Sequence, residues 1–341
     1  MKQHFLRVFG AIGALGLASI LPACGGSGVG PSATPTPQST PQPTNPATFV
    51  AYLDENANGT FEPSEGTRIP GVEVVVGTAK GTTAARSGAL TLQIPDGAQT
   101  VTVTASSLPP FYRPPAAGIS LTAPATAQVM IPITLPRGSN RANVYMAFGD
   151  SITKGEPNVG DGTGYRRTLA NLLESHFGAG EVANEGRDAT DTNDGADIIG
   201  TRLAAIRPTF VLIHYGTNDW NNCKQVPCFT TTNLRFMVQQ INRVGAHAFL
   251  ASILPTNTGY DDRAPASRNI WVGENNVLIK QIADQEGAVF VDLNAAFLAS
   301  GRALPALFVD HVHPTAPGYE IMAQTWFSAI TKAYSKILSD F

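Results

Sequence analysis

A serine that could act as a nucleophile follows a strand-like stretch of the chain. Residues 144–148 form an apolar run, typical of a buried strand, that breaks at Gly149 just before Ser151. Open α/β sheets bind their ligands at the carboxyl ends of the strands, so this position suits a reactive side chain. Because Gly-Asp-Ser is also ordinary turn composition, this stretch alone leaves a plain turn open.

A serine hydroxyl needs a base within hydrogen-bond reach, and the carboxyl-terminal part of the chain offers one. His313 is the natural base, because an imidazole titrates near neutral pH. Asp310 precedes it by three residues, so one turn of chain lets its carboxylate reach the imidazole and fix the tautomer. His311 is the immediate neighbour of Asp310 and would tend to point away. An aspartate and two histidines so close together could also bind a metal, but no further metal ligands lie nearby in the sequence.

Two polar stretches between the serine and the histidine suit the stabilisation of an oxyanion. Asn218 supplies an uncharged amide donor for a negative charge that forms only in the transition state. Gly186 offers a backbone N–H without a side chain that would block a substrate. A plain turn after the apolar run that ends near His214 also accounts for Asn218.

The segments that carry these residues alternate between strand-like and helix-like patterns. Apolar runs predict strands at residues 144–148, 181–184, 210–214, 248–254 and 288–292. Apolar side chains recur at helical spacing over residues 165–177 and 319–337. This alternation predicts an α/β fold, in which helices cover both faces of a parallel sheet.

Together, the four polar stretches resemble the signature blocks of the SGNH (GDSL-type) hydrolases. They stand in the order of that family, at residues 149–153, 184–186, 216–219 and 310–314. The resemblance covers residues 141–338, within a hydrolase domain that we expect over 141–341. It implies a flavodoxin-like three-layer α/β/α domain with five parallel strands.

The resemblance also implies a role for each residue. Ser151 is then the nucleophile, and Gly186 and Asn218 join it in the oxyanion hole. The D-x-x-H pattern of the family selects Asp310 and His313 to complete the triad. No metal or cofactor takes part in catalysis, and two further residues, Asp150 and Asp219, are structural.

The activity implied is that of a serine esterase that forms an acyl-enzyme. The stretch 164–166 resembles one in the acetyl-xylan-type carbohydrate esterases of the family. We therefore expect a small acyl ester or polysaccharide ester as substrate, with carbohydrate O-acetyl esters first. Lysophospholipase or lipase activity is the alternative. A surface binding or adhesion protein with an inactive hydrolase domain is an alternative of another class, against which the intact set of site residues argues.

Residues 48–136 predict a small all-β sandwich before the hydrolase domain. Short stretches alternate apolar and polar residues between turns, at 49–53, 72–76, 89–94, 100–104 and 128–135. One loop fits the calcium pattern D-x-[DN]-x-[DN]-G-x5-E, with oxygen ligands from Asp54, Asn56, Asn58 and Glu65. It lacks the helices of an EF-hand and resembles the calcium loops of B-repeat-like domains in bacterial surface adhesins. We predict a structural calcium; a hairpin that binds no ion is the alternative.

The amino-terminal residues predict export. Residues 1–23 read as a signal peptide, with a basic start and an apolar stretch. The residues before Cys24 resemble a bacterial lipobox, which implies lipidation of that cysteine. Residues 24–47, rich in Pro, Thr and Ser, predict a disordered linker. We expect a bacterial lipoprotein on the outer membrane or cell surface, with a periplasm-facing position possible; an ordinary signal peptide is the alternative.

Composition and cysteines complete these expectations. The net charge of −3 and the absence of a basic run give no sign of nucleic-acid binding, and membrane contact is expected through the lipid anchor only. Cys223 and Cys228 predict a local disulfide in an exported protein, with free thiols as the alternative. The sequence carries no signal for an oligomeric state.

Overall fold

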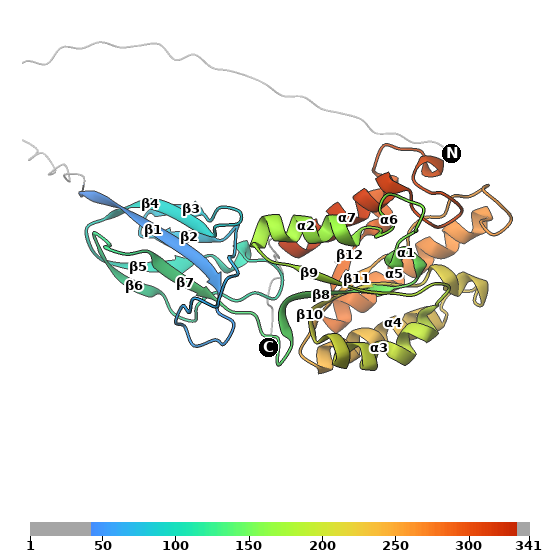
Figure 1. Ribbon diagram of the computed structural model, residues 1–341, viewed down its shortest axis with the longest axis horizontal. Coiled ribbons are helices and arrows are strands. Elements are labelled where there is room, and N and C mark those ends of the chain that lie inside the picture. Colours follow the sequence, from blue (N-terminus) through green and yellow to red (C-terminus); the bar gives the residue numbers. More distant parts are fainter. Residues whose placement is uncertain (1–41, 333–341) are drawn as a thin grey trace, which may run out of the picture. The chain divides into compact units, whose positions relative to one another are not determined.

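A computed structural model describes residues 42–332 as a β-rich region followed by an α/β region (Figure 1). These residues belong to one compact unit. The predicted signal peptide, Cys24 and the linker up to residue 41 lie outside the described residues. Among the helices of residues 42–332, none has the length and apolar character needed to cross a bilayer.

Five parallel strands form the sheet of the α/β region. They are β8 (Arg141–Gly149), β9 (Glu181–Gly186), β10 (Pro208–His214), β11 (His247–Ala251) and β12 (Val289–Val291). Their order in the sheet is β12-β11-β10-β8-β9, and each neighbouring pair is parallel. This is the flavodoxin-like order, whose switch point lies between β8 and β10. The expected fold class is confirmed.

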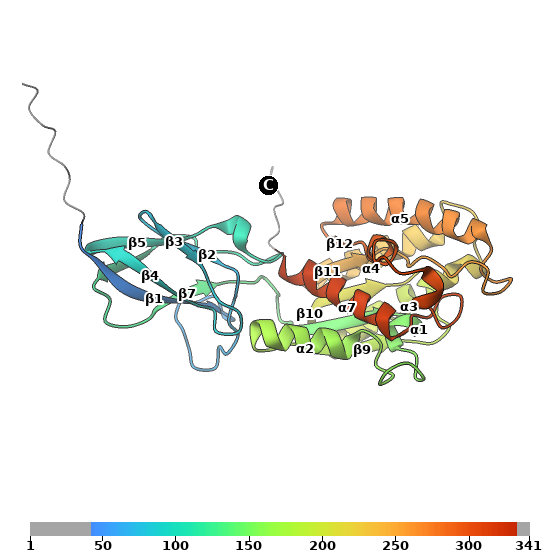
Figure 2. The same ribbon diagram turned by 90° about the horizontal axis from the view of Figure 1, so that it is seen from above.

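Helices cover both faces of this sheet, which gives three layers (Figure 1). One face carries α2 (Arg166–Phe177), α6 (Leu293–Leu298) and α7 (Ala316–Thr331). The other carries α3 (Thr192–Ile206), α4 (Phe229–Arg243) and α5 (Ala266–Glu286). Figures 1 and 2 both show α2 and α7 side by side.

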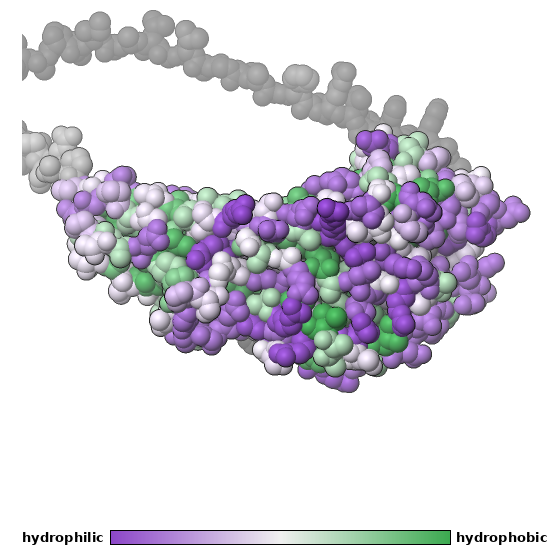
Figure 3. Space-filling view, in the orientation of Figure 1, coloured by the Kyte–Doolittle hydropathy of each residue, from purple (hydrophilic) through white to green (hydrophobic). Residues whose placement is uncertain are grey.

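Alternation along the strands divides the apolar side chains between two cores. In β8, Tyr145 and Ala147 join the core under α2 and α7, whereas Met146 and Phe148 join the core under α3 to α5. A strand buried on both faces reads as a continuous apolar run, which is why the sequence pattern found it. In the view of Figure 3, hydrophilic residues cover much of the α/β region, with separate apolar spots between them.

Two sheets form the β-rich region and confirm the expected sandwich. One has the order β4-β1-β7 and the other β3-β2-β5-β6. Apolar side chains of both sheets, such as Phe49, Ile131, Val74 and Val101, share one core. The strands are β1 (Thr44–Leu53), β2 (Glu73–Val76), β3 (Ala79–Thr82), β4 (Ala89–Pro95), β5 (Gly97–Val103), β6 (Ile119–Ala123) and β7 (Val129–Ile133).

One predicted boundary needs correction. Strand β1 begins at Thr44, so residues 44–47 belong to the sheet and not to the disordered linker predicted over 24–47. Thr44 pairs with Pro95 and Ala47 with Leu92, in antiparallel register with β4. Backbone pairing stabilises these residues, and their mostly polar side chains gave no strand pattern.

Backbone hydrogen bonds and a ring stack join the β-rich and α/β regions. The N–H of Arg86 donates to the carbonyl of His176 at 2.8 Å, and the N–H of Arg68 donates to that of Phe177 at 3.3 Å. The ring of Phe111 stacks on that of His247, with centroids 4.2 Å apart. The β-rich region therefore packs on the end of α2 and on the start of β11.

Candidate active site

The turn after β8 presents Ser151 at the carboxyl edge of the sheet. Asp150 caps the short helix α1 (Ser151–Lys154), because its Oδ1 accepts the N–H of Ile152 at 2.9 Å. A side chain at position 149 would collide with Thr153 and with the carbonyl of His214, so only glycine fits there. The Gly-Asp-Ser stretch is thus a strand-to-helix turn rather than a surface loop.

Ser151, His313 and Asp310 form one hydrogen-bonded chain. The Oγ of Ser151 lies 2.8 Å from Nε2 of His313, and Nδ1 of His313 lies 2.8 Å from Oδ2 of Asp310. Oδ1 of Asp310 accepts the N–H groups of Val312 and His313, each at 2.7 Å. With the Nδ1 proton held by the carboxylate, Nε2 is left to accept the serine proton.

Electrostatics favour a charged His313. Burial raises the pKa of Asp310, but the hydrogen bonds from the His313 ring and from two backbone N–H groups outweigh it and hold that pKa well below its usual range. The hydrogen bond with Asp310 raises the pKa of His313 above 6.5, against burial, which lowers it. The carboxylate therefore stabilises the imidazolium that forms when Ser151 gives up its proton.

His311 takes a different position. Its Nδ1 is buried and lies 3.9 Å from carboxylate oxygens of both Asp261 and Asp310, beyond hydrogen-bond distance. Its carbonyl accepts the N–H of Asn257 at 3.0 Å, which ties this segment to the loop after β11. Burial lowers the pKa of His311. Of the two histidines, the structure brings His313 to the serine.

The two candidate oxyanion donors lie at or just after the ends of the strands that flank β8. Gly186 pairs with Gly149 in the β8–β9 register, and Asn218 follows β10, whose last residue His214 also pairs with Gly149. One N–H of the Asn218 amide donates to the carbonyl of Thr190 at 2.8 Å. The N–H of Gly186 donates to Oδ1 of Asn184 at 3.0 Å. The sheet thus brings both residues to the edge that carries Ser151.

Residues 164–166 pack against the serine turn and bind its backbone. Tyr165 is fully buried. The guanidinium of Arg166 donates to the carbonyls of Thr153, at 3.1 Å, and Lys154, at 2.7 Å. The stretch that resembles carbohydrate esterases therefore holds α1 in place.

The predicted calcium loop turns its oxygen atoms inward. Oδ2 of Asp54 accepts the N–H of Gly59 at 2.8 Å, and the two carboxylate oxygens of Glu65 accept the N–H groups of Glu55 and Glu62 at 2.9 and 3.0 Å. Asp54 and Glu65 are each only 3% exposed. The remaining predicted ligands, Asn56 and Asn58, lie in the same loop, and each accepts a backbone N–H through its Oδ1.

The loop offers carboxylate and amide oxygens as donors. The sequence pattern did not select Glu62, whose Oε2 is buried and has no hydrogen-bond partner among the described residues. Carboxylate and amide oxygens are the ligands that Ca²⁺ prefers. Within residues 42–332, no group of three or more His, Cys, Asp and Glu side chains is arranged to hold a metal. Amide or backbone oxygens would therefore have to complete the site.

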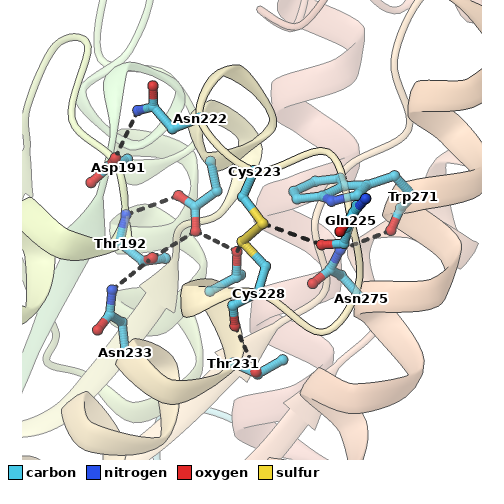
Figure 4. Close-up of a disulfide and its surroundings, with 12 residues drawn as sticks. Asp191, Thr192, Asn222, Cys223, Gln225, Cys228, Thr231, Asn233, Trp271 and Asn275 are labelled. Atoms are coloured by element: carbon cyan, nitrogen blue, oxygen red, sulfur yellow. Dashed lines mark hydrogen bonds between the residues drawn. A yellow bond between two sulfur atoms is a disulfide. The ribbon is translucent and has the colours of Figure 1, made fainter.

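Cys223 and Cys228 are joined by a disulfide in the loop after the Asn218 turn (Figure 4). Cys228 directly precedes α4, and the N–H of Cys223 donates to the carbonyl of Asp219 at 2.8 Å. The bond closes a short loop between the 3₁₀ helix η2 (Thr217–Asn221) and α4.

Sequence reasoning missed one charged residue near this turn. Arg268 is 2% exposed and donates to the carbonyl of Thr217 at 2.9 Å. A lone arginine near the start of a helix carries no pattern that would mark it in the sequence, because its partners are carbonyl groups, which every residue has.

Comparison with known proteins agrees with this geometry. The profile of the GDSL-like Lipase/Acylhydrolase family matches residues 147–321, more than half of the chain. No curated protein matches the chain. Similar solved structures include an acetylxylan esterase from Geobacillus stearothermophilus, with 24% identity, a TM-score of 0.46 and coverage of 59% of this chain and 100% of that one. Another is an α/β hydrolase enzyme from the metagenome of Lake Arreo, with 21% identity, a TM-score of 0.46 and coverage of 57% and 98%.

The family match includes the serine turn and the Asp310–His313 segment, which the fold brings together from opposite ends of the matched stretch. The chain belongs to the GDSL-like lipase and acylhydrolase family and is a carboxylic ester hydrolase.

Proposed function

We propose that this hydrolase removes short acyl groups, above all acetyl groups, from carbohydrates, with Ser151 as nucleophile. The observation that carries the proposal is the hydrogen-bonded chain from Ser151 through His313 to Asp310. A serine, a base and a carboxylate in that order are what acyl transfer through a serine requires.

In the acylation step, Oγ of Ser151 bonds to the ester carbonyl carbon while its proton passes to Nε2 of His313. The carbonyl oxygen becomes an oxyanion, for which Asn218, Gly186 and the N–H of Ser151 are the proposed donors. The bond to the alcohol oxygen then breaks, and His313 gives its proton to the leaving alcohol.

In the deacylation step, His313 takes a proton from water as the water oxygen bonds to the acyl carbon. The bond to Oγ of Ser151 breaks, Oγ recovers the proton, and the carboxylic acid leaves. Asp310 keeps the imidazole oriented through both steps. The residues complete this cycle without a metal or cofactor.

Polar surroundings of Ser151 support a polar alcohol and a short acyl group. Lys154 forms an exposed ion pair with Asp188, next to the serine turn and the β9 end. The exposed large apolar residues of the described chain are Phe236, Val244, Tyr260, Ile270, Val277, Leu298 and Val309. Only Val309, next to Asp310, and Tyr260, in the loop after β11, belong to segments that contact the triad. A long acyl chain would need a larger apolar surface.

Hydrolysis rates on three substrate series test this function. We expect acetylated xylo-oligosaccharides and p-nitrophenyl acetate to be hydrolysed by the protein and spared by Ser151→Ala. Rates on p-nitrophenyl esters should fall as the acyl chain lengthens. A higher kcat/KM on lysophospholipids than on acetylated sugars would instead support the lipase alternative.

We further propose that the protein is an exported lipoprotein anchored through Cys24. The signal-like residues 1–23, the lipobox-like residues before Cys24 and an oxidised cysteine pair support this proposal. The mass of the amino-terminal peptide of the mature protein tests it, because lipidation adds acyl chains to a chain that begins at Cys24. A mature chain that starts elsewhere would contradict the anchor.

We also propose a structural calcium ion held by Asp54, Asn56, Asn58 and Glu65. The buried, inward-facing carboxylates of Asp54 and Glu65 support it. An ion at this place would neutralise buried negative charge and fix the loop, and it would take no part in ester hydrolysis.

A further inference from the structure

Two buried charged side chains anchor the residues on either side of Asn218: Arg268 binds Thr217, and Asp219 is anchored by its own carboxylate. Asp219 is 0% exposed and Arg268 is 2% exposed. Neither forms an ion pair with another side chain within residues 42–332. Burying a charge without an opposite charge is costly, so each needs a dense set of hydrogen bonds to remain in place.

Arg268 holds the residue before Asn218. Its Nη2 donates to the carbonyl of Thr217 and its Nη1 to that of Arg263, each at 2.9 Å. Burial lowers the pKa of Arg268 to about 10, so the guanidinium is charged at neutral pH. The carbonyl of Thr217 and the N–H of Asn218 belong to one peptide group. A cation on that carbonyl fixes the peptide plane and strengthens its N–H as a donor.

Asp219 is the residue after Asn218, and its own side chain anchors it. Its carboxylate accepts the N–H of Thr192 at 2.9 Å, the hydroxyl of Thr192 at 2.6 Å and the hydroxyl of Thr230 at 2.5 Å. Thr192 opens α3 and Thr230 lies in the first turn of α4, so the carboxylate faces the amino-terminal ends of two helices. Figure 4 shows Thr192, Asn222 and the disulfide gathered at this turn.

The Asn218 turn is therefore fixed at three points. Arg268 holds Thr217, three hydroxyl and N–H groups hold Asp219, and the Asn218 amide itself donates to Thr190. The three anchors come from α5, from α3 with α4, and from the loop before α3. An oxyanion donor needs this restraint, because its N–H must lie about 3 Å from an oxygen that is charged only in the transition state.

We propose that Arg268 and Asp219 are positioning residues for the oxyanion donor Asn218. Neither forms a hydrogen bond with Ser151 or His313; their hydrogen bonds fix the two residues that flank Asn218. The proposal rests on the proposed function, which makes Asn218 an oxyanion donor. It gives a purpose to two buried charges whose removal from water is costly.

Arg268→Met and Thr230→Val test the proposal on the full-length protein with p-nitrophenyl acetate. Asn218→Ala sets the scale, with an expected loss in kcat of about 100-fold. We expect Arg268→Met to lower kcat about tenfold and Thr230→Val a few-fold, with KM within about twofold of the parent. Asp219→Asn should lower kcat at least as much as Thr230→Val, where the variant folds.

A double-variant cycle separates positioning from general damage. In the Asn218→Ala background, Arg268→Met should lower kcat no further, because the donor that it positions is gone. Arg235→Met is the matched control. Arg235 pairs with Glu286 on α5, away from the turn, and its loss should leave kcat unchanged. Asp292→Asn removes the cap of α6 and should lower the melting temperature without lowering kcat.

The outcomes distinguish this proposal from the proposed function. If Asn218→Ala leaves kcat unchanged, the oxyanion role of Asn218 fails and the positioning role fails with it. If Asn218→Ala lowers kcat but Arg268→Met and Thr230→Val do not, the positioning role alone is wrong. An equal loss from Arg268→Met in the parent and Asn218→Ala backgrounds would also overturn it.

Discussion

Both regions of the molecule bury carboxylates, but they satisfy them in different ways. In the α/β region, the Asp310–His313 pair reaches Ser151 across 162 residues of chain, and Asp219 binds threonines at the starts of two helices. In the β-rich region, Asp54 and Glu65 accept N–H groups from within their own loop. The first arrangement exists only when the whole α/β fold has formed, whereas the second is set by local backbone.

This difference predicts that substitutions in the two networks have different effects. Residues in the long-range network should affect rate, because they hold reacting atoms that the fold has brought together. Residues in the local loop should affect stability, because nothing in their contacts reaches Ser151. Variants in each region can sharpen or break that division.

The two neighbouring histidines provide the largest contrast. His313→Ala removes the base and should lower kcat by about 10,000-fold or more, with little change in melting temperature. His311→Ala, next to it in the chain, should change kcat by less than about tenfold. Steady-state rates on p-nitrophenyl acetate measure both. Loss of activity in His311→Ala alone would break the assignment of the triad.

The sequence predicted the long-range network better than the local one. The four blocks in their order joined Ser151, Gly186 and Asn218 in one site through the family resemblance, and the structure places them at one edge of the sheet. The apolar runs of the parallel sheet were visible because those strands are buried on both faces.

The features that the sequence could not predict are those whose residue types carry no pattern. Arg268 binds carbonyls, which every residue carries, so no residue pattern reveals its partners. Strands β3 and β6 were missed because their side chains are largely polar or small and exposed on one face. Glu62 occupies an unspecified position of the calcium pattern, and only the burial of its Oε2 draws attention to it.

The pH dependence of activity tests the charge balance within the triad. Asp310 raises the pKa of His313 above 6.5, and the base must be neutral to accept the serine proton. The value of kcat/KM should therefore rise with pH, with a midpoint above 6.5. Asp310→Asn removes the carboxylate, so the midpoint should move to lower pH and the maximal rate should also fall.

Asp150 provides the control for this profile. It is fully buried beside Ser151, and burial raises its pKa to about 7. Its titration could produce the same acid limb. If His313 is responsible, the acid limb should persist in Asp150→Asn with a lower midpoint, because the Asp150 carboxylate also raises the pKa of His313. A midpoint that disappears in Asp150→Asn and persists in Asp310→Asn would assign the limb to Asp150 instead.

The smallest expected effect is that of calcium removal on the loop of residues 54–65 in the β-rich region. If the loop with Asp54, Asn56, Asn58 and Glu65 holds calcium, a chelator should lower the melting temperature of the full-length protein by several degrees. An ion at about 100 times its Kd stabilises a folded protein by about 2.7 kcal/mol, and that contribution is lost with the ion. Because the loop satisfies its carboxylates locally, kcat on p-nitrophenyl acetate should not change.

Glu65→Gln makes this prediction specific to the loop. The amide keeps the size of the side chain but removes one charge and replaces an acceptor oxygen that receives an N–H from Glu55 or Glu62. Its melting temperature should be lower than that of the parent, and the chelator should lower it no further. If the chelator lowers both proteins equally, the ion binds elsewhere. If it lowers neither, the loop is a hairpin whose carboxylates the backbone alone stabilises, and the local network needs no ligand.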